Sequence, residues 1–379
     1  MTKISLTMKT ANTFFAAFLL AVATGTMLSC KGTQTAATST ICNPLPMNFG
    51  DPFLLHAADG KYYMYGTSLG DGYEAYASSD LVTWEKCGQV YKGGGDNNWN
   101  TNCFWAPEVY EFNGKYYMFY SANYRVNPTG EGENFKIGVA VADKPAGPFR
   151  DIYNRPIFNP NYPIIDANVL HDSKSGKFYL YYSRCCYKHP VESEIADEAR
   201  RRGTFKEIEE SWVYGVELKS DFSGIVGEPK LLLSPPSKAD DSQAEWESRS
   251  VTSGDVGRRW TEGSFIFEHK GTYYMMYSAN SFEGKYYAVG YATAKSPLGP
   301  FTKAANNPVL QENVSKGGTV MGTGHNMVAT LPDGKLYCVY HARLKSDPGK
   351  RTVFIDRMSI KGGKLTVDGP TTAPQQIKR

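Results

Sequence analysis

A short pattern recurs five times along this chain: a turn glycine followed by a run of aromatic residues. It reads DGKYYMYGTS (59–68), NGKYYMFYSA (113–122), SGKFYLYYSR (175–184), KGTYYMMYSA (270–279) and DGKLYCVYHA (333–342). Asp-Gly or Asn-Gly before an alternating aromatic run is typical of a hairpin turn and the strand after it. The pattern therefore predicts five equivalent β-hairpins.

The spacing of the turn glycines indicates the architecture. These glycines are Gly60, Gly114, Gly176, Gly271 and Gly334. They lie 54, 62, 95 and 63 residues apart, and a unit of that size holds about four short strands, as one propeller blade does. The sequence predicts an all-β fold, a five-bladed β-propeller that forms a single domain over residues 43–379. The long third interval predicts an insertion at 187–259, charged and partly helical at 192–212.

The N-terminal segment predicts export. A basic start and an apolar run at 14–23, too short to span a bilayer, precede LSC (28–30). This order resembles a bacterial lipoprotein signal, with a signal peptide at 1–29 and a lipidated Cys30 and tether at 30–42. An ordinary signal peptide cleaved nearby is the alternative. We expect a cell-envelope protein held to the outer membrane by its lipid, on either the periplasmic or the outer side.

Charge and cysteine content exclude some classes of partner. The formal net charge is only +3, whereas nucleic-acid binding needs a concentrated basic surface. No Cys/His spacing indicates a zinc site. The adjacent Cys185 and Cys186 are interpreted as one buried thiol and one loop thiol. We expect neither nucleic acid nor an organic cofactor.

The strand before each repeat glycine should be the innermost strand of its blade. Innermost strands line the channel of a propeller, so equivalent positions of different blades meet there. Counting back nine residues from each glycine, or ten in the third repeat, gives Asp51, Trp105, Asp166, Glu262 and His325. Any one of them alone could be a strand-end residue in a turn. All five in one phase favour a functional site.

Three carboxylates beside an aromatic plate suit the cleavage of a glycosidic bond. That reaction needs a protonated carboxylic acid near the leaving oxygen and an ionised carboxylate opposite it. A third carboxylate nearby can raise the pKa of the acid by like-charge repulsion. The indole of Trp105 offers a flat apolar face on which a sugar ring can stack.

At these residues the chain resembles glycoside hydrolase family 43. The matching motifs are G-D-P-F (50–53), W-A-P-E-V (105–109), I-D-A-N-V (165–169), T-E-G-S-F (261–265) and G-H-N (324–326). The resemblance covers nearly all of residues 43–379 and implies hydrolysis with inversion of the anomeric configuration. It implies that Asp51 is the general base, that Glu262 is the general acid, and that Asp166 tunes and orients the acid.

The resemblance also assigns roles to residues around the acids. It implies that His325 helps to hold a calcium or sodium ion in the channel, largely through water; orienting a neighbouring group is the alternative. Arg351 resembles an arginine that reaches the substrate from the last blade, although it could also be a solvated hairpin charge. Glu108 lies one residue off the inner phase and is interpreted as a supporting group.

The leading hypothesis is an exo-acting α-L-arabinofuranosidase on arabinose- or xylose-containing plant cell-wall polysaccharide. The chain has no residues left for the extra C-terminal β-sandwich that β-xylosidases of this family often carry, and the insertion could wall off one end of the cleft. A β-xylosidase, an endo-arabinanase or a galactan-active hydrolase are the enzymatic alternatives. The non-enzymatic alternative is an inactive, glycan-binding surface lipoprotein.

Overall fold

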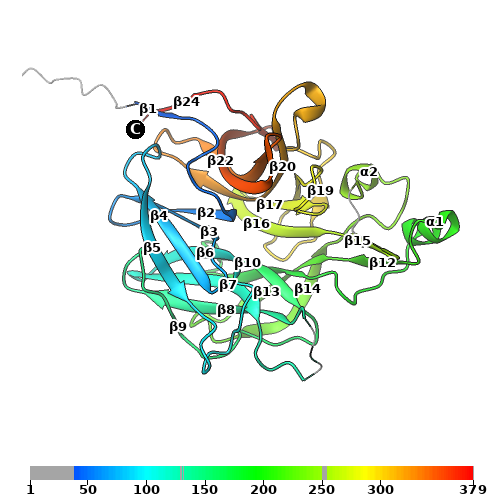
Figure 1. The fold of residues 1–379 in the computed structure, drawn as a ribbon, viewed down its shortest axis with the longest axis horizontal. Helices are drawn as coiled ribbons and strands as arrows, with labels where there is room; N and C mark the ends of the chain where they lie inside the picture. The colour runs from blue at the N-terminus through cyan, green and yellow to red at the C-terminus, as the bar shows by residue number, and fades with distance from the viewer. Residues whose placement is uncertain (1–37, 129, 131, 250–253, 379) are drawn as a thin grey trace, which may run out of the picture. The chain divides into compact units, whose positions relative to one another are not determined.

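The computed structural model describes residues 38–378, apart from 129, 131 and 250–253, and these residues form five four-stranded antiparallel sheets around a central axis (Figure 1). Blade 1 contains β2 (Gly50–His56), β3 (Tyr62–Thr67), β4 (Gly72–Ser78) and β5 (Glu85–Lys92). Blade 2 contains β6 (Trp105–Phe112), β7 (Lys115–Asn123), β8 (Phe135–Ala142) and β9 (Arg150–Asp151). Blade 3 contains β10 (Ile164–Asp172), β11 (Lys177–Arg184), β13 (Trp212–Leu218) and β14 (Ile225–Leu233). Blade 4 contains β16 (Thr261–His269), β17 (Thr272–Ala279), β18 (Ala288–Ala294) and β19 (Thr302–Lys303), and blade 5 contains β20 (Val320–Thr330), β21 (Leu336–Leu344), β22 (Asp347–Lys361) and β23 (Lys364–Val367).

The predicted five-bladed propeller is therefore confirmed. Each repeat glycine lies in the turn between the first and second strands of its blade. All five glycines have φ between 68° and 82°, and a Cβ added at any of them would meet no atom within 4 Å. The backbone conformation of the turn, not a lack of space, requires glycine there.

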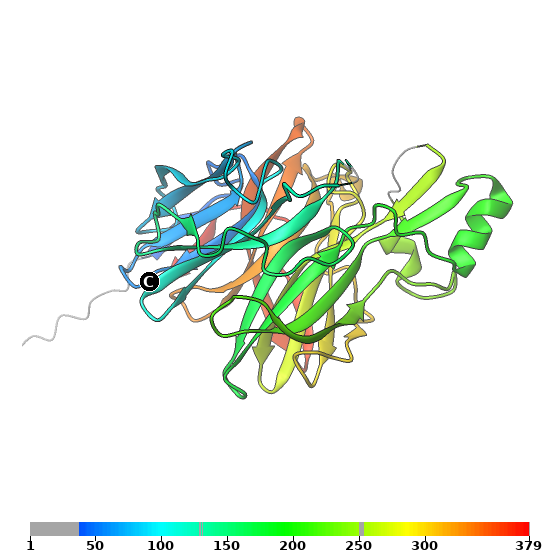
Figure 2. The same cartoon turned by 90° about the horizontal axis from the view of Figure 1, so that it is seen from below.

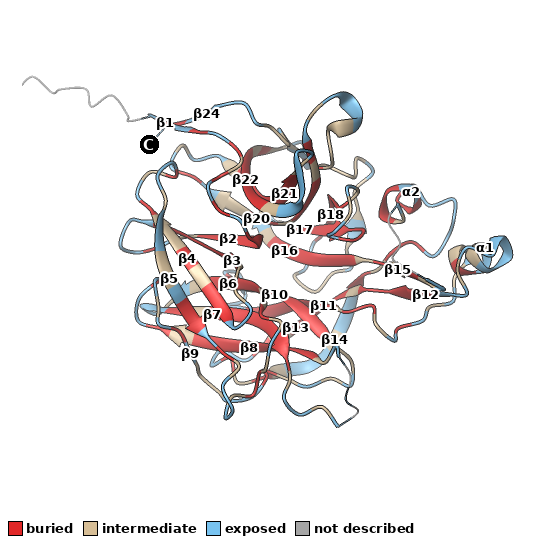
Figure 3. Ribbon diagram, viewed as in Figure 1, coloured by how far each residue is buried: buried red, intermediate tan, exposed pale blue. Residues whose placement is uncertain are grey.

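The aromatic runs are continuous because both faces of each second strand are buried between neighbouring blades. On β17, Tyr273, Met275 and Tyr277 pack in a cluster shared with blade 3. Tyr274 and Met276, which alternate with them, pack in a cluster shared with blade 5. Successive side chains of a strand point to opposite faces, so a strand with two buried faces reads as an unbroken apolar run. Figure 3 shows these second strands largely in red, the colour of buried residues.

The two ends of the described chain pair with each other. β1 (Thr38–Ile41) runs antiparallel to β24 (Gln375–Lys378). The side chain of Asn43 then bonds to blade 5, donating to the carbonyl of Ile355 and accepting from its N–H, each at 2.9 Å. The tether predicted at 30–42 is thus wrong for its last residues, because 38–41 belong to the folded part. The predicted signal peptide (1–29) and Cys30 lie outside the described residues.

The predicted insertion at 187–259 also needs correction. Its central part supplies β13 and β14, the third and fourth strands of blade 3. Trp212–Leu218 has the alternating burial of a strand, but the charged residues around it hid that signal. The excursion consists of 187–211 and 234–259, which together are called the insertion arm below.

The insertion arm is held together by a parallel strand pair. It contains α1 (Glu194–Arg202), β12 (Glu207–Glu210), α2 (Ala244–Glu247) and β15 (Val256–Arg259), and β12 pairs with β15. Figure 2 shows the arm projecting to one side of the blades. Elsewhere a short 3₁₀ helix spans Val314–Lys316. None of the helices in the described part of the chain has the length and apolar character needed to span a bilayer.

A buried ion pair lies at the base of the arm. Arg259 Nη1 donates to Glu210 Oε1 at 2.7 Å, and the two side chains are only 1% and 3% exposed. Arg259 Nε also donates to Ser248 Oγ at 3.1 Å, and Trp212 Nε1 donates to Glu210 Oε2 at 2.8 Å. Removing one charge would leave the other buried without a partner, which is costly.

Replacing Arg259 with methionine should therefore lower the free energy of unfolding by about 3 kcal/mol or more. Arg249→Met, which breaks the exposed pair with Glu245, should cost less than about 1 kcal/mol. The double variant Arg259→Met, Glu210→Gln should recover much of the loss, because neither residue is then charged. Urea denaturation of the four proteins tests this. Equal stability of Arg259→Met and Arg249→Met would contradict it.

Candidate active site

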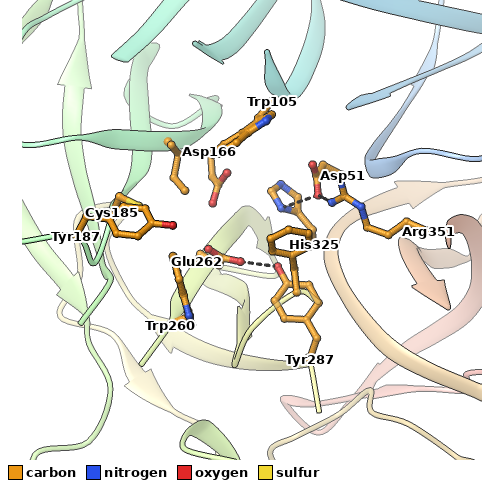
Figure 4. A pocket seen from close by; sticks show the side chains of 12 residues that line it. Asp51, Trp105, Asp166, Cys185, Tyr187, Trp260, Glu262, Tyr287, His325 and Arg351 are labelled. Atoms are coloured by element: carbon orange, nitrogen blue, oxygen red, sulfur yellow. Dashed lines mark hydrogen bonds and ion pairs between the residues drawn. The ribbon is translucent and has the colours of Figure 1, made fainter. Parts of the chain in front are cut away.

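All the site residues predicted within the described part of the chain line one pocket at the centre of the propeller (Figure 4). Its lining consists of Asp51, Trp105, Ile165, Asp166, Cys185, Tyr187, Trp260, Glu262, Phe282, Tyr287, His325 and Arg351. The cavity has a volume of about 140 Å³. The three predicted catalytic carboxylates are each no more than 9% exposed. The convergence inferred from the repeat count is thus present in the structure.

A β-bulge interrupts the innermost strand of every blade at this level. In β2, for example, the register shifts between Gly50 and Phe53, so that two residues stand opposite one residue of β3. The residue at the bulge has a left-handed backbone: φ is 55° at Asp51, 59° at Asp166 and 49° at His325. A bulge redirects side chains and is common beside active sites.

The bulge corrects the predicted phase of the five residues. Asp51, Asp166 and His325 occupy the left-handed position itself. Trp105 and Glu262 occupy the position one residue earlier, where they pair with serines of the second strand. The five are therefore in two adjacent phases rather than one. Both phases face the pocket because the bulge breaks the strict alternation of side chains.

Hydrogen bonds between blades hold the bulges in place. They run from the N–H of Ala106 to Thr67 Oγ1 (2.9 Å), of Asp166 to Ser121 Oγ (3.0 Å), of Gly263 to Asp166 Oδ2 (3.1 Å), of His325 to Ser278 Oγ (2.7 Å) and of Asp51 to His341 Nδ1 (3.1 Å). Each bond joins one blade to the next, and the last joins blade 1 to blade 5. These bonds stabilise left-handed residues that would otherwise be strained.

Asp51 lies among positive and polar groups. Its Oδ1 is 3.0 Å from Arg351 Nη1 and 3.3 Å from His325 Nδ1, and its Oδ2 accepts a hydrogen bond from the Thr67 hydroxyl at 2.5 Å. Burial alone would raise the pKa of Asp51, but Arg351 and the two histidines, His325 and His341, hold it well below its usual value. Asp51 is therefore ionised at neutral pH.

Arg351 reaches Asp51 across a glycine. A Cβ at Gly50 would lie 2.0 Å from the guanidinium carbon of Arg351, so only glycine at this position leaves room for the ion pair. Arg351 also lies over the ring of Phe282, 5.0 Å from its centroid. Of the two interpretations of Arg351, a solvated hairpin charge does not fit this position in the pocket.

Glu262 has the opposite electrostatic environment. Burial, followed by the charge of Asp166, raises the pKa of Glu262 well above its usual value, although a hydrogen bond from Tyr287 opposes the shift. That bond runs from the Tyr287 hydroxyl to Glu262 Oε1 at 2.9 Å. Burial and the charge of Asp166 therefore favour the protonated form of Glu262, which carries a proton that it can donate.

Asp166 lies where it can orient the acid. Its Oδ2 accepts hydrogen bonds from the N–H of Gly263, the residue after Glu262, and from the Ser183 hydroxyl at 3.3 Å. Burial raises the pKa of Asp166, and the charge of Asp51 adds to the rise. The three carboxylates thus differ in their ability to hold a proton, which is how acid and base are separated within one site.

Glu108 supports the inner strands from outside the pocket lining. It accepts hydrogen bonds from the Tyr110 hydroxyl and from Asn168 Nδ2, the latter at 3.0 Å. Asn168 Oδ1 in turn accepts from the N–H of Ile266 at 3.0 Å, so the group links blades 2, 3 and 4. Burial raises the pKa of Glu108 to about 8, with a further contribution from Asp166.

This shift predicts a pH dependence of stability. The folded-state pKa of Glu108 lies above its ordinary value of 4.5, so its stabilising contribution is complete below that value and is lost as the pH rises through about 8. Relative to Glu108→Gln, the wild type should lose about 2 kcal/mol of unfolding free energy between pH 6 and pH 8. Urea denaturation at both pH values measures the difference. Glu111→Gln, at an exposed position of the same strand, should behave as wild type. Parallel pH curves for wild type and Glu108→Gln would show the assignment to be wrong.

The sequence did not predict four of the aromatic residues in the pocket: Tyr187, Trp260, Phe282 and Tyr287. Trp260 lies two residues before Glu262, so extending the count along the inner strand could have found it. The other three come from segments outside the inner strands, and no local pattern marks them. Cys185 also lines the pocket. Cys185 and Cys186 both follow the end of β11 at Arg184, and both are buried, so the expected buried thiol is present and the thiol in the loop is buried as well.

The predicted calcium or sodium ion would lie against His325. In the described part of the chain, no group of three or more His, Cys, Asp or Glu side chains could hold a metal ion. An ion held directly by several side chains therefore does not fit these residues. An ion held by His325 largely through water stays a prediction. The contact of His325 with Asp51 also suits the alternative role of orienting a neighbour.

Three buried carboxylates of unequal proton affinity, set among aromatic rings in a propeller channel, define a glycoside hydrolase site. Comparison with known proteins agrees: the chain belongs to the glycosyl hydrolases family 43, whose family model matches residues 41–365. It is similar to a β-D-galactofuranosidase of Aspergillus niger, with 27% identity over 86% of this chain and 83% of the relative. It is also similar to a xylosidase/arabinosidase of Bacteroides ovatus, with 26% identity over 77% of this chain and 86% of the relative.

A solved structure has a fold similar to that of this chain. A thermostable family-43 glycoside hydrolase superimposes with a TM-score of 0.73 at 35% identity, covering 88% of this chain and 97% of that one. The family and these relatives identify the chain as a glycosidase.

Proposed function

We propose that this glycosidase hydrolyses its substrate with inversion, using Asp51 as general base and Glu262 as general acid. The observation that carries the proposal is the opposite direction of their pKa shifts within one pocket. Asp51 removes a proton from water as that water attacks the anomeric carbon. The bond from that carbon to the leaving oxygen breaks, and Glu262 gives its proton to the oxygen. Proton exchange with solvent restores both groups.

Asp166 acts on Glu262 rather than on the substrate in this proposal. Its hydrogen bond to the N–H of Gly263 holds the backbone beside the acid. Its negative charge also raises the pKa of Glu262, which keeps the acid protonated until the leaving group departs.

For the substrate we propose an arabinose- or xylose-containing plant polysaccharide, cleaved at the non-reducing end by an α-L-arabinofuranosidase activity. The B. ovatus relative is named a xylosidase/arabinosidase and the A. niger relative a β-D-galactofuranosidase. The α-L-arabinofuranose and β-D-galactofuranose rings have the same configuration and differ in the exocyclic chain, so one furanose pocket can suit both. β-Xylosidase is the second candidate, because the B. ovatus name includes it.

The shape of the pocket supports exo-acting cleavage. Tyr187 and Trp260 line one side of the pocket. Arg351 and Phe282, whose ring lies under the Arg351 guanidinium, line another part of it. Bulky side chains on two sides of a small cavity favour binding of the end of a chain over its middle.

Product analysis by proton NMR on an arabinan and an arabinoxylan tests the whole proposal. We expect free arabinose to be released first as the inverted anomer. Release of xylose alone would favour the β-xylosidase, and long oligosaccharides without free arabinose would indicate an endo-arabinanase. Initial release of the retained anomer would disprove the assignment of Asp51 as a base. Binding without any hydrolysis would favour the non-enzymatic alternative.

We also propose that Cys30 carries the lipid that anchors the mature protein to the outer membrane. The signal-like order of residues up to LSC (28–30) supports this. The wild type should partition into the detergent phase on extraction, and Cys30→Ala should partition into the aqueous phase. Aqueous partitioning of the wild type would rule the anchor out.

A further inference from the structure

Two aromatic residues lie on the side of the pocket away from the base. Figure 4 shows Tyr187 and Trp260 on one side of Glu262, with Asp51 and Arg351 on the other. Both aromatic residues line the cavity. Their rings meet edge to face, with centroids 5.9 Å apart and an interplanar angle of 83°.

The chemistry of the reaction distinguishes these two sides. The base activates water on one face of the sugar that is cleaved off, and the acid protonates the leaving oxygen on the other. Groups beyond Glu262, away from Asp51, therefore face the part of the substrate that departs. In a polysaccharide that part is another sugar ring, whose C–H face packs well on an aromatic surface.

The insertion arm braces this aromatic wall. The guanidinium carbon of Arg258 lies over the ring of Tyr187, 5.1 Å from its centroid. Arg258 is held there by Glu209, at 2.8 Å from Nε to Oε2, and the two residues are register partners in the parallel pairing of β12 with β15. Glu209 Oε1 also accepts the N–H of Lys188, next to Tyr187. The start of the arm, which bears Tyr187, is thus fixed by the β12–β15 pair, outside the five blades.

We propose that Tyr187 and Trp260 form the binding site for the leaving-group sugar, and that the β12–β15 pair of the insertion arm holds this site in place. The inference rests on the proposed assignment of Glu262 as acid and Asp51 as base. It makes the arm a determinant of which polysaccharide linkage is cleaved, separate from the carboxylates that cleave it.

Two substrates with the same sugar on the non-reducing side of the cleaved bond test the proposal. One is a methyl glycoside, whose leaving group has no ring to pack on Tyr187 and Trp260. The other is a disaccharide, whose leaving group is a sugar ring. Both leaving groups are alcohols, and the difference in their acidity cancels when a variant is compared with the wild type. The quantity measured is the ratio of kcat/KM for the disaccharide to kcat/KM for the methyl glycoside. This ratio should fall about tenfold in Tyr187→Ala and in Trp260→Ala, which corresponds to about 1.4 kcal/mol of lost transition-state binding.

Further variants distinguish the site from a general structural effect. Tyr187→Phe keeps the ring and should keep the ratio. Arg258→Met removes the brace and should lower the ratio about threefold, in line with a cation–π contact at a partly exposed site. Lys206→Ala breaks an exposed pair with Asp255 on the same arm and should leave both substrates unaffected.

An unchanged ratio in both alanine variants would overturn the inference, and so would a loss shared equally by the two substrates. Failure of the wild type to hydrolyse either substrate would instead count against the proposed function. Thermal melting of each variant identifies one that fails to fold, and Tyr187→Leu, which retains bulk without a ring, then takes the place of Tyr187→Ala with the same expected fall.

Discussion

Replacing Glu262 with glutamine should lower kcat about 10³- to 10⁴-fold for a substrate whose leaving group is a sugar. Glutamine keeps the shape and can still accept the hydrogen bond from Tyr287, but it has no proton to donate. In a 2,4-dinitrophenyl glycoside the leaving group, 2,4-dinitrophenolate, departs without protonation. The kcat of Glu262→Gln for this substrate should therefore fall by less than about tenfold. Steady-state kinetics on both substrates measure the difference.

The matched control is Glu268→Gln, an exposed residue on the same strand, β16. It should leave both rates within about twofold of the wild type, since it is far from any proton transfer. Equal losses on the sugar and dinitrophenyl substrates in Glu262→Gln would contradict the role of acid. Loss of the alkaline limb of the pH–rate profile with the substrate whose leaving group is a sugar would support it.

Replacing Asp51 with asparagine should lower kcat by about 10³-fold or more on both substrates. Water must lose its proton whichever leaving group departs, so a better leaving group gives no rescue. The two carboxylate variants therefore differ in pattern: one is sensitive to the leaving group and the other is not. Arg351 and the two histidines hold the pKa of Asp51 well below its usual value, against the effect of burial, so the proposed base is ionised at neutral pH.

An exposed aspartate provides the control for this second variant. Asp143 pairs with the solvent-exposed Lys115 and does not line the pocket, so Asp143→Asn should have wild-type kinetics. Recovery of Asp51→Asn activity with the dinitrophenyl substrate would show that Asp51 assists the leaving group instead. Retention of more than about a tenth of the activity on both substrates would remove it from the mechanism altogether.

The blade count could be predicted because each hairpin is a local structure. An Asp-Gly or Asn-Gly turn needs the left-handed backbone that glycine adopts, as at Gly60 and Gly114. The aromatic run after it reports a strand buried on both faces. Both signals lie within about ten residues of each other, so they can be recognised in the sequence without any knowledge of the tertiary fold.

The outer strands of blade 3 could not be predicted in the same way. β14 (Ile225–Leu233) is largely exposed, and an exposed edge strand carries polar residues that resemble a loop. β13 lies between charged segments of the insertion arm. The interval between Gly176 and Gly271 showed that extra residues were present, but not which of them belonged to the blade.

For the site, sequence spacing was enough to bring Asp51, Asp166 and Glu262 together, because a propeller places equivalent inner positions around one channel. It could not show that Asp51 and Glu262 occupy adjacent phases, since a bulge changes the alternation of side chains without changing the composition of the strand.

The sequence by itself therefore determined five blades and three converging acids, both of which follow from local turn chemistry and a repeat. Only the tertiary structure decided which acid keeps its proton. The charge on Asp51 depends on Arg351, 300 residues away in the chain, and Glu262 depends on its burial beside Asp166. Likewise Tyr187 and Trp260, 73 residues apart in the chain, come together only in the folded structure. A pKa and a binding surface are set by what lies nearby in space, and local sequence does not record those neighbours.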